Sequence, residues 1–404
     1  MRIAYITYEY PPDIGLGGIA TYNFQIARVM KERGHDVEVF CGSFFRNISE
    51  EYYQVLTHRV KISDVIDFRN KVIEVFAERH SFKPFDLFES PEINGNGYLI
   101  NQKFPELPMV VKIHMPSVLQ IQLLNYYTPF LTKLKFVISS LIKKRKIDLG
   151  FWSSKDKNQH SDVDYLITEQ ASIITAPSEA MKNWAVRFWG INEARIKVIP
   201  YPYIPDKKYL EITLEKNFKR ITFIGKLNVH KGLVVYTEAI ENVLKLYPDY
   251  KFRFVAEDGS SHKPGISMKE YILKRLQNYS ENLEFTGSVP LSEIPEHLKV
   301  SDICVFPSIW ECFGLVVCEA MAAGKPVIVS GNGGMKEIVE NEVTGLVVNP
   351  LDSQAIAYAI GLMITDKEMA NRLAMNGRQS IIKKYNVENI GIMNEKIYNE
   401  VICV

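Results

Sequence analysis

Two glutamates lie on either side of a glycine in the second half of the chain: Glu311 and Glu319, with Gly314 between them. The apolar run over 303–307 predicts a strand before this glycine, and 315–323 predicts a helix after it. The free backbone amides at the start of such a helix favour phosphate, and carboxylates accept hydrogen bonds from hydroxyl groups. The segment therefore predicts a binding site for a ligand that carries both phosphate and sugar hydroxyls.

Two lysines follow another apolar run. Lys226 and Lys231 lie in the segment 224–232, at and after the end of the predicted strand 221–225. Ligands of parallel α/β sheets bind at the carboxyl ends of the strands, so both ammonium groups are expected at that edge. There they could neutralise a leaving diphosphate. Without Glu311 and Glu319, we would interpret both lysines as solvated loop charges.

The first half of the chain contributes a histidine and a glycine loop. His114 ends the predicted strand 109–114, where an imidazole can hydrogen-bond a polar ligand. Gly17 and Gly18 precede a predicted helix and form a second anion-binding loop. The same loop matches the dinucleotide pattern G-x-G-x-x-A, but the strand after the helix lacks the ribose-binding acid of that pattern. This argues against a dinucleotide.

Short apolar strands alternate with helical segments along the chain. The predicted strands are 2–8, 37–41, 109–114, 172–176, 198–200, 221–225, 252–256, 283–287, 303–307 and 326–330. This alternation is typical of parallel α/β sheets. At 404 residues we expect two domains. They are an N-terminal one over 1–204 and a C-terminal one over 205–385, with a helix over 386–404 that packs back on the first.

Charge and composition exclude several kinds of partner. The 48 basic and 47 acidic residues nearly cancel, so no nucleic-acid partner is expected. Five cysteines without metal-ligand spacing or disulfide density favour a reducing cytoplasm. Neither a signal peptide nor a membrane-spanning run is expected. Asp162 and Asp164 resemble a metal-binding DxD pair, but Ser161 fits a helix N-cap, so we interpret them as helix-start acids and expect no metal.

The segment 119–146 combines apolar and aromatic residues with six basic residues and no acid. One interpretation is peripheral contact with an anionic membrane, which would place the protein at the inner face of that membrane. The other, slightly favoured, is an amphipathic helix that packs on the first domain and has a solvated basic end. Liposome flotation with and without anionic lipid separates the two.

Together these segments resemble the retaining GT-B glycosyltransferases of family 4 (group 1) over nearly the whole chain. The matching elements are Glu311–Glu319, Gly225–Gly232, His114, the Gly17–Gly18 loop and Gly333–Val348. The resemblance implies an α/β, GT-B fold, in which two Rossmann-like parallel-sheet domains face each other across a cleft. The first domain would lie on the acceptor side, and the second would bind a nucleotide diphosphate sugar. It also implies transfer of a hexose-type sugar to an acceptor hydroxyl, with retention of configuration and without a metal or other cofactor.

The resemblance also implies roles for single residues. Glu319 would hold the donor ribose and Glu311 would contact the transferred sugar, with His114 and Lys231 completing the catalytic set. The leaving phosphate would take the acceptor proton, so no single general base is expected. The donor contacts would be Gly17, Gly18, Lys226, Lys231 and Glu319, together with backbone amides around Phe313, Gly314, Leu315 and Val316.

Two positions depart from the family pattern. Lys226 stands where arginine is common, and 199–206 reads IPYPYIPD where an Asn-Gly pair is frequent. We assume uridine as the donor base, with a saccharide or lipid-linked saccharide as the acceptor in cell-surface polysaccharide or glycolipid synthesis. Two alternatives remain at this stage. One is another nucleotide-sugar enzyme of the same architecture, such as an epimerase or phosphorylase, and the other is a non-catalytic sugar- or nucleotide-binding protein.

Overall fold

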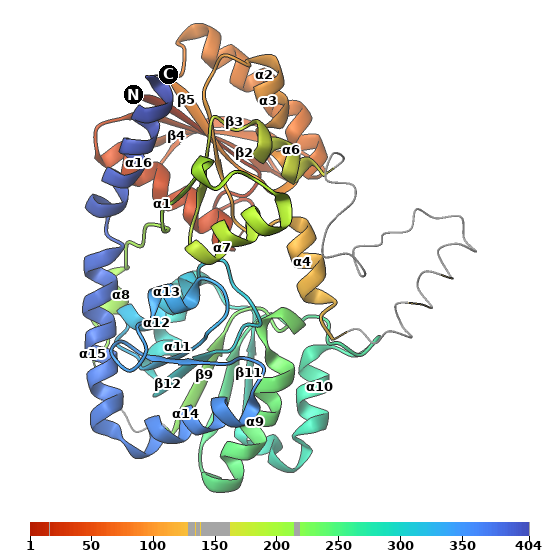
Figure 1. The fold of residues 1–404 in the computed structure, drawn as a ribbon, viewed down its shortest axis with the longest axis vertical. Helices are drawn as coiled ribbons and strands as arrows, with labels where there is room; N and C mark the ends of the chain where they lie inside the picture. The colour runs from red at the N-terminus through yellow and green to blue at the C-terminus, as the bar shows by residue number, and fades with distance from the viewer. Residues whose placement is uncertain (16, 128–133, 135–137, 139–161, 214–218, 404) are drawn as a thin grey trace. The chain divides into compact units, whose positions relative to one another are not determined.

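The computed structural model describes the chain except for residues 16, 128–133, 135–137, 139–161, 214–218 and 404. The chain divides into two compact units, each with its own sheet (Figure 1). The first unit consists of Met1–Ser117, Lys155–Ile204 and Tyr385–Val404, and the second of Val118–Ser154 and Pro205–Lys384. Each unit is an α/β body, which confirms the predicted alternation of strands and helices.

The first unit is built on an eight-stranded sheet in the order β3-β4-β2-β1-β5-β6-β7-β8. Its strands are β1 Arg2–Thr7, β2 Asp36–Ser43, β3 Ile48–Tyr52, β4 Val55–Lys61, β5 Leu87–Pro91, β6 Met109–Lys112, β7 Ile173–Ala176 and β8 Ile196–Val198. All pairs are parallel except β3 with β4. The helices are α1 Gly18–Glu32, α2 Val65–Phe82, α3 Tyr98–Lys103, α6 Val163–Gln170, α7 Glu179–Trp184 and α16 Val387–Ile402.

The second unit has a six-stranded parallel sheet in the order β11-β10-β9-β12-β13-β14. Its strands are β9 Arg220–Ile224, β10 Lys251–Val255, β11 Leu283–Gly287, β12 Ile303–Phe306, β13 Val327–Ser330 and β14 Leu346–Val348. Its helices are α8 Lys207–Leu210, α9 Leu233–Leu246, α10 Met268–Arg275, α11 Ile294–Lys299, α12 Leu315–Ala322, α13 Met335–Ile338, α14 Ser353–Thr365 and α15 Lys367–Lys384. Helix α4 (Ser117–Leu124) starts at the last residue of the first unit's opening segment.

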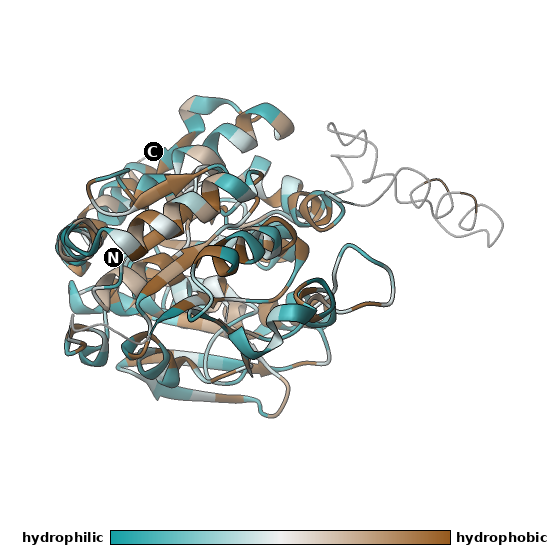
Figure 2. Cartoon of the chain, turned by 90° about the horizontal axis from the view of Figure 1, so that it is seen from below, coloured by the Kyte–Doolittle hydropathy of each residue, from teal (hydrophilic) through white to brown (hydrophobic). Residues whose placement is uncertain are grey.

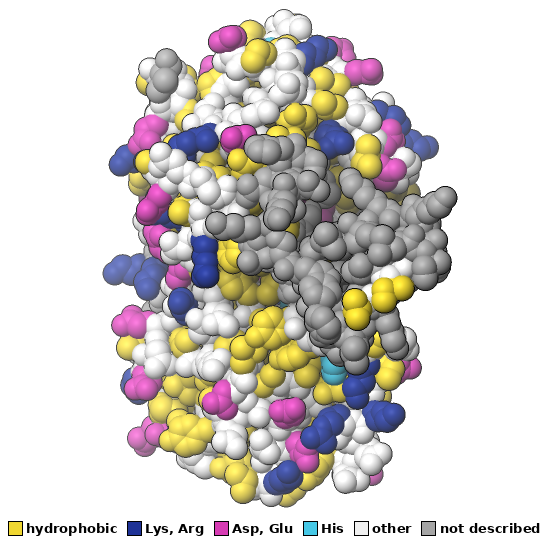
Figure 3. Space-filling model, turned by 45° about the vertical axis from the view of Figure 1, so that its right-hand side comes forward, with side chains coloured by type: hydrophobic (Ala, Val, Ile, Leu, Met, Phe, Trp, Pro, Cys, Tyr) yellow, Lys and Arg dark blue, Asp and Glu magenta, His cyan; other side chains and the backbone are white. Residues whose placement is uncertain are grey.

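The strands form the apolar interior of each unit. Strands β1 and β12 are buried at every residue, as parallel strands covered on both faces should be. Figure 2 shows brown strands inside and helices that carry both teal and brown faces. Acidic and basic side chains are interspersed over the face drawn in Figure 3, in keeping with a formal net charge of +1.

Helix α16 brings the C-terminal residues onto the first unit. Arg33, which follows α1, donates to Glu395 at 2.8 Å and to Glu388 at 2.8 Å. The helices approach so closely that a side chain at Gly391 would come within 2.2 Å of Arg33 Cδ. On its inner face, the Tyr398 hydroxyl donates to Glu89 at 2.6 Å. Polar contacts therefore hold this helix against both α1 and β5.

Three details differ from the expectations above. Strand β8 spans Ile196–Val198 instead of the predicted 198–200. It does not extend to residue 200, because Pro200 has no N–H to donate to a strand ladder. Helix α6 is capped by Asp162 rather than Ser161, since its carboxylate accepts from the Asp164 N–H at 3.0 Å. Strand β3 is antiparallel to its neighbour in an otherwise parallel sheet.

Two further observations bear on membrane contact. No helix among the described residues is long and apolar enough to cross a bilayer. Helix α4 buries Leu119 and Leu123, but most of the basic segment predicted over 119–146 lies outside the described residues. Both interpretations of that segment therefore stay predictions.

Candidate active site

The turn between β12 and α12 has the geometry that the glycine was expected to provide. Gly314 is the N-cap of α12 with φ 114°, a conformation that side chains rarely adopt. No side chain caps the helix, and its first turn contains no acidic residue. The first amides of α12, at Leu315 and Val316, have no acceptor within the helix. The helix start is therefore an uncapped cluster of N–H groups that can donate hydrogen bonds to an anion.

Glu311 precedes this turn and forms an ion pair with Lys231. The two loops that carry them are fastened together, because the Ile309 N–H donates to the His230 carbonyl at 2.8 Å. Gly232, with φ 75°, lies so close to Pro307 that a side chain there would meet its carbonyl oxygen at 1.8 Å. Contact between the two segments thus requires glycine at this position, which sets the approach of Lys231 to Glu311.

A second glycine contact fixes Glu311 from the other side. The Gly334 N–H donates to the Glu311 carbonyl at 2.7 Å. A side chain at Gly333 would come within 2.2 Å of the same oxygen. The Gly333–Val348 segment, predicted to matter only by resemblance, therefore has a physical task in holding the backbone of Glu311.

Opposing effects decide the charge of Glu311. Burial would raise the pKa of its carboxyl, but the Lys231 ammonium outweighs burial and holds the pKa below its usual value. His230 is half-buried beside the same pair, and burial together with Lys231 lowers its pKa to about 4. Near neutral pH the site contains an ionised Glu311, paired with Lys231, and a neutral His230.

Glu319, within α12, is in a different electrostatic environment. Its side chain is half-buried and has no hydrogen bond or ion pair among the described residues. Burial raises the pKa of its carboxyl to about 7. Tyr209, from α8, lies near enough for Glu319 to help raise the pKa of the phenol. A ligand that donates hydrogen bonds would stabilise the ionised form of Glu319.

Lys226 is separate from the Glu311 and Lys231 pair. Its side chain is 53% exposed and lies 3.4 Å from Glu257, itself exposed. Leu227 and Asp258, which follow Lys226 and Glu257, form a β-bridge, so the loops after β9 and β10 lie side by side here. A surface pair of this kind contributes little by itself and leaves the ammonium available to a ligand.

In the first unit, the glycine loop has an acidic neighbour. Gly17 and Gly18 are exposed at the start of α1, which has no side-chain cap and no acid in its first turn. The Glu9 carboxylate lies beside the loop, 3.8 Å from where a side chain at Gly17 would begin. Burial raises the pKa of Glu9. A hydroxyl group would meet less repulsion at this loop than a phosphate would.

His114 is buried at the end of β6 in a cluster of aromatic rings. It is 2% exposed, its Nδ1 contacts the Tyr201 hydroxyl, and the ring of Tyr22 lies edge-on at 5.1 Å. Its Nε2 has no hydrogen-bond partner within the described part of the chain. Burial and then the charge of Lys112 hold the pKa of His114 well below its ordinary value. The imidazole is therefore neutral, and its unpaired nitrogen is buried.

The structure brings together some predicted residues and adds others. Within the second unit, Glu311 and Lys231 are in contact, and Glu319 lies on the helix that follows Glu311. His114 belongs to the first unit. Sequence reasoning missed Glu92, Tyr201 and His230 as neighbours of the predicted residues. A glutamate directly after a predicted strand would have been the signal for Glu92, but the strand β5 was itself not predicted.

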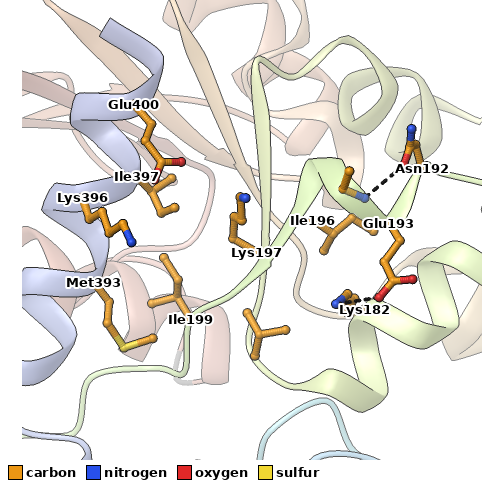
Figure 4. A pocket seen from close by; sticks show the side chains of 12 residues that line it. Lys182, Asn192, Glu193, Ile196, Lys197, Ile199, Met393, Lys396, Ile397 and Glu400 are labelled. Carbon is orange, nitrogen blue, oxygen red and sulfur yellow. Dashed lines mark hydrogen bonds and ion pairs between the residues drawn. The ribbon is translucent and has the colours of Figure 1, made fainter. Parts of the chain in front are cut away.

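A pocket of about 820 Å³ lies elsewhere in the first unit, between β8 and α16 (Figure 4). Ile196, Ile199 and Ile397 contribute apolar side chains to its lining, and Lys182, another lining residue, is paired with Glu193 at 2.9 Å. None of the site residues predicted from the sequence lines this pocket.

Comparison with known proteins decides the family. The model for group 1 glycosyl transferases matches residues 207–380, and the model for glycosyltransferase family 4 matches residues 16–207. The chain belongs to the family 4, group 1 glycosyltransferases. An uncharacterized glycosyltransferase of Methanocaldococcus jannaschii is 26% identical over 422 residues and covers 98% of each chain.

Solved structures agree on the fold. The sucrose-phosphate synthase of Thermosynechococcus elongatus has a TM-score of 0.72 and 20% identity, with 100% of both chains covered. The Anabaena protein HepE in complex with UDP-glucose has a TM-score of 0.66 and 18% identity, covering 99% of this chain and 100% of that one. The predicted family and the GT-B fold of this glycosyltransferase are thus confirmed.

Proposed function

We propose that this glycosyltransferase moves a hexose-type sugar from a nucleotide diphosphate sugar to an acceptor hydroxyl, with retention of configuration and without a metal ion. One observation carries the proposal: the Lys231 and Glu311 ion pair lies beside the uncapped start of α12, which also carries Glu319. A nucleotide diphosphate sugar requires positive charge and free amides for its phosphates, and hydrogen-bond acceptors for its hydroxyl groups. Uridine is the proposed base because HepE was crystallised with UDP-glucose.

In this proposal the second unit binds the donor. The amides around Phe313, Gly314, Leu315 and Val316 hold phosphate and sugar oxygens, and Lys231 and Lys226 neutralise the charge that develops on the diphosphate. No metal is needed, because two ammonium groups and a helix N-terminus do the same work. Within the part of the chain that the structure describes, no group of histidine, cysteine and acidic side chains could hold a metal ion.

Glu319 and Glu311 accept hydrogen bonds from different hydroxyl groups of the donor. Glu319 accepts from the ribose, and a pKa near 7 in the empty protein falls when the hydroxyls bind. Glu311 is ionised before the donor arrives, since Lys231 lowers its pKa. It accepts from the transferred sugar and stabilises positive charge that develops at the anomeric carbon. The leaving phosphate takes the acceptor proton.

The first unit contributes the acceptor side. In addition, its His114 offers a neutral imidazole to a hydroxyl of the transferred sugar. Gly17 and Gly18 remain the proposed donor contacts of this unit, and there is nothing within 4 Å of where a side chain at Gly18 would begin. The proposed acceptor is a saccharide or lipid-linked saccharide in cell-surface polysaccharide or glycolipid synthesis.

Two measurements test the proposal. Thermal-shift titration with UDP, GDP and ADP, each with magnesium or with EDTA, should show the largest stabilisation with UDP and no difference between magnesium and EDTA. Labelled UDP-glucose with a pool of saccharide and lipid-linked acceptors should then give an α-linked product. Binding that requires magnesium, or a β-linked product, would contradict metal-free retention. An interconverted donor without any transfer product would instead indicate an epimerase.

A further inference from the structure

We infer that Glu92, in its uncharged form, is a positioning residue that holds His114 in place for the transferred sugar. The inference rests on the role proposed above for His114. It goes beyond that proposal because nothing in the sequence motifs marks Glu92, and because it assigns the protonation state in which the residue works.

The first observation is a bridge between two strand ends. Strands β5 and β6 are neighbours in register, with Pro91 opposite Lys112. Each strand ends there, and the next residues are Glu92 on one side and Ile113 and His114 on the other. The Glu92 N–H donates to the Lys112 carbonyl at 3.3 Å, and Glu92 Oε2 accepts the His114 N–H at 2.8 Å. The side chain thus continues the ladder for one step where backbone pairing stops.

The second observation is that this carboxyl is enclosed. Glu92 is 0% exposed, and its Oε1 has no hydrogen-bond partner among the described residues. A buried, ionised carboxylate in such a place would bear a large desolvation cost unless a cation faced it. The charges around Glu92 therefore decide its form.

The neighbouring charges favour the neutral acid. Asp164 on α6 is 1% exposed and is the acid that faces Glu92. Its own oxygens accept the N–H groups of Asn94 and Ser117 at 2.7 and 2.9 Å. Lys112, the buried lysine at the end of β6, donates to the Ile199 carbonyl and lies over the ring of Tyr22 at 5.2 Å.

Burial and then the charge of Asp164 raise the pKa of Glu92 to about 8. Near pH 7 it is therefore a neutral acid that accepts the His114 N–H. Above pH 8 it gains a charge beside Asp164, and repulsion between the two carboxylates should displace the oxygen that accepts the His114 N–H. The position of His114 should therefore change at that pH.

The central variant is Glu92→Gln, which keeps an oxygen that can accept the His114 N–H but cannot ionise. We expect hydrolysis of UDP-glucose without acceptor to proceed at the wild-type kcat at pH 7. Wild type should lose kcat above about pH 8, and this loss should be absent in Glu92→Gln. The matched variant Glu92→Ala should lose about 10- to 100-fold in kcat at pH 7, because a misplaced catalytic group costs on this order. Its KM for the donor should change little, since the second unit binds the nucleotide.

A double-mutant cycle distinguishes positioning from general damage. Glu92→Ala should add no further loss to His114→Ala if it acts only through His114. The thermal shift produced by UDP should be the same in all four proteins, as should the secondary structure. A full additional loss in the double variant would overturn the inference, and so would a Glu92→Gln variant that is as slow as Glu92→Ala.

A second measurement needs no donor. With ring-labelled histidine, the NMR signal of His114, identified by its loss in His114→Ala, should shift with a midpoint near pH 8 in wild type but not in Glu92→Gln. An unchanged midpoint in Glu92→Gln, or no shift in wild type, would overturn the role of Glu92. Wild-type hydrolysis by His114→Ala would instead overturn the proposed role of His114, while the NMR result still decides whether Glu92 and His114 are coupled.

Discussion

The polar clusters of the two units handle buried charge in opposite ways. In the second unit, Glu311 is ionised because Lys231 compensates for its burial, with side chains 14% and 20% exposed. In the first unit, His114 and Glu92 are almost fully buried and are neutral instead. A paired charge suits a site that must meet a diphosphate, whereas neutral groups suit a site that must select hydroxyls. The comparison predicts different pH and salt responses for variants of the two clusters.

The largest effect should come from the paired charge. Glu311→Gln keeps the shape of the side chain but removes its negative charge, so we expect kcat to fall about 10²- to 10³-fold, as for loss of one electrostatic contact to a transition state. UDP affinity should change little. Steady-state kinetics with labelled donor measures both. Glu340→Gln, an exposed glutamate of the same unit, is the control. Wild-type turnover in Glu311→Gln would show that the negative charge of Glu311 is not needed. The two clusters would then not differ in their use of charge.

A variant of Glu319 tests whether the second unit also contains a carboxyl group that titrates near neutral pH. Glu319→Gln should weaken UDP binding by about 10- to 100-fold, the range for a hydrogen bond to a charged group. Because burial raises the pKa of Glu319 to about 7, wild-type affinity should increase from pH 6 to pH 8 as the carboxylate forms. Calorimetry across this range measures it. The variant shows how much of the change comes from the phosphate of UDP itself, and identical slopes in both proteins would count against Glu319.

Tyr201 sharpens the description of the neutral cluster. Tyr201→Phe removes the hydroxyl that contacts His114 Nδ1 while keeping the ring beside Tyr22. Loss of one hydrogen bond, about 1 kcal/mol, predicts a fall in kcat of roughly fivefold without a change in UDP affinity. Tyr53→Phe, on an exposed tyrosine of the same unit, should have no effect. A change in UDP affinity without a change in kcat would show that Tyr201 does not act through His114.

The smallest effect is expected at Lys226. Its exposed ammonium lies 3.4 Å from Glu257, so Lys226→Ala should weaken UDP binding only about two- to fivefold. The loss should shrink as salt is raised, because exposed charges are screened. Lys226→Arg should bind at least as tightly as wild type, since its planar group can contact two phosphate oxygens. A loss at Lys226 as large as that at Glu319 would contradict the weak role assigned to exposed charge.

Regular patterns made most of the fold predictable. Apolar strands such as β12 and β13 were recognised because both faces are buried and the sequence is almost continuously apolar. Strand β4 was not, because it carries His58 and Arg59, whose burial depends on Glu38 and Glu50 from neighbouring strands. A polar residue can occupy an interior strand only when a distant partner satisfies it, and local sequence does not reveal that partner.

The same division applies to the Glu311 and Glu319 segment and to its partners. By itself the sequence determined the strand, the glycine turn and the helix, because these depend on apolar spacing and on a backbone conformation that glycine allows. The ends of predicted strands made Lys231 and His114 candidates, and the resemblance gave them roles. Only the tertiary structure decided that Lys231 neutralises Glu311, that Gly232 and Gly333 permit that approach, and that Glu92 lies against His114. Charge states are set by burial and by neighbours far apart in the chain, so they follow from the folded protein rather than from spacing along it.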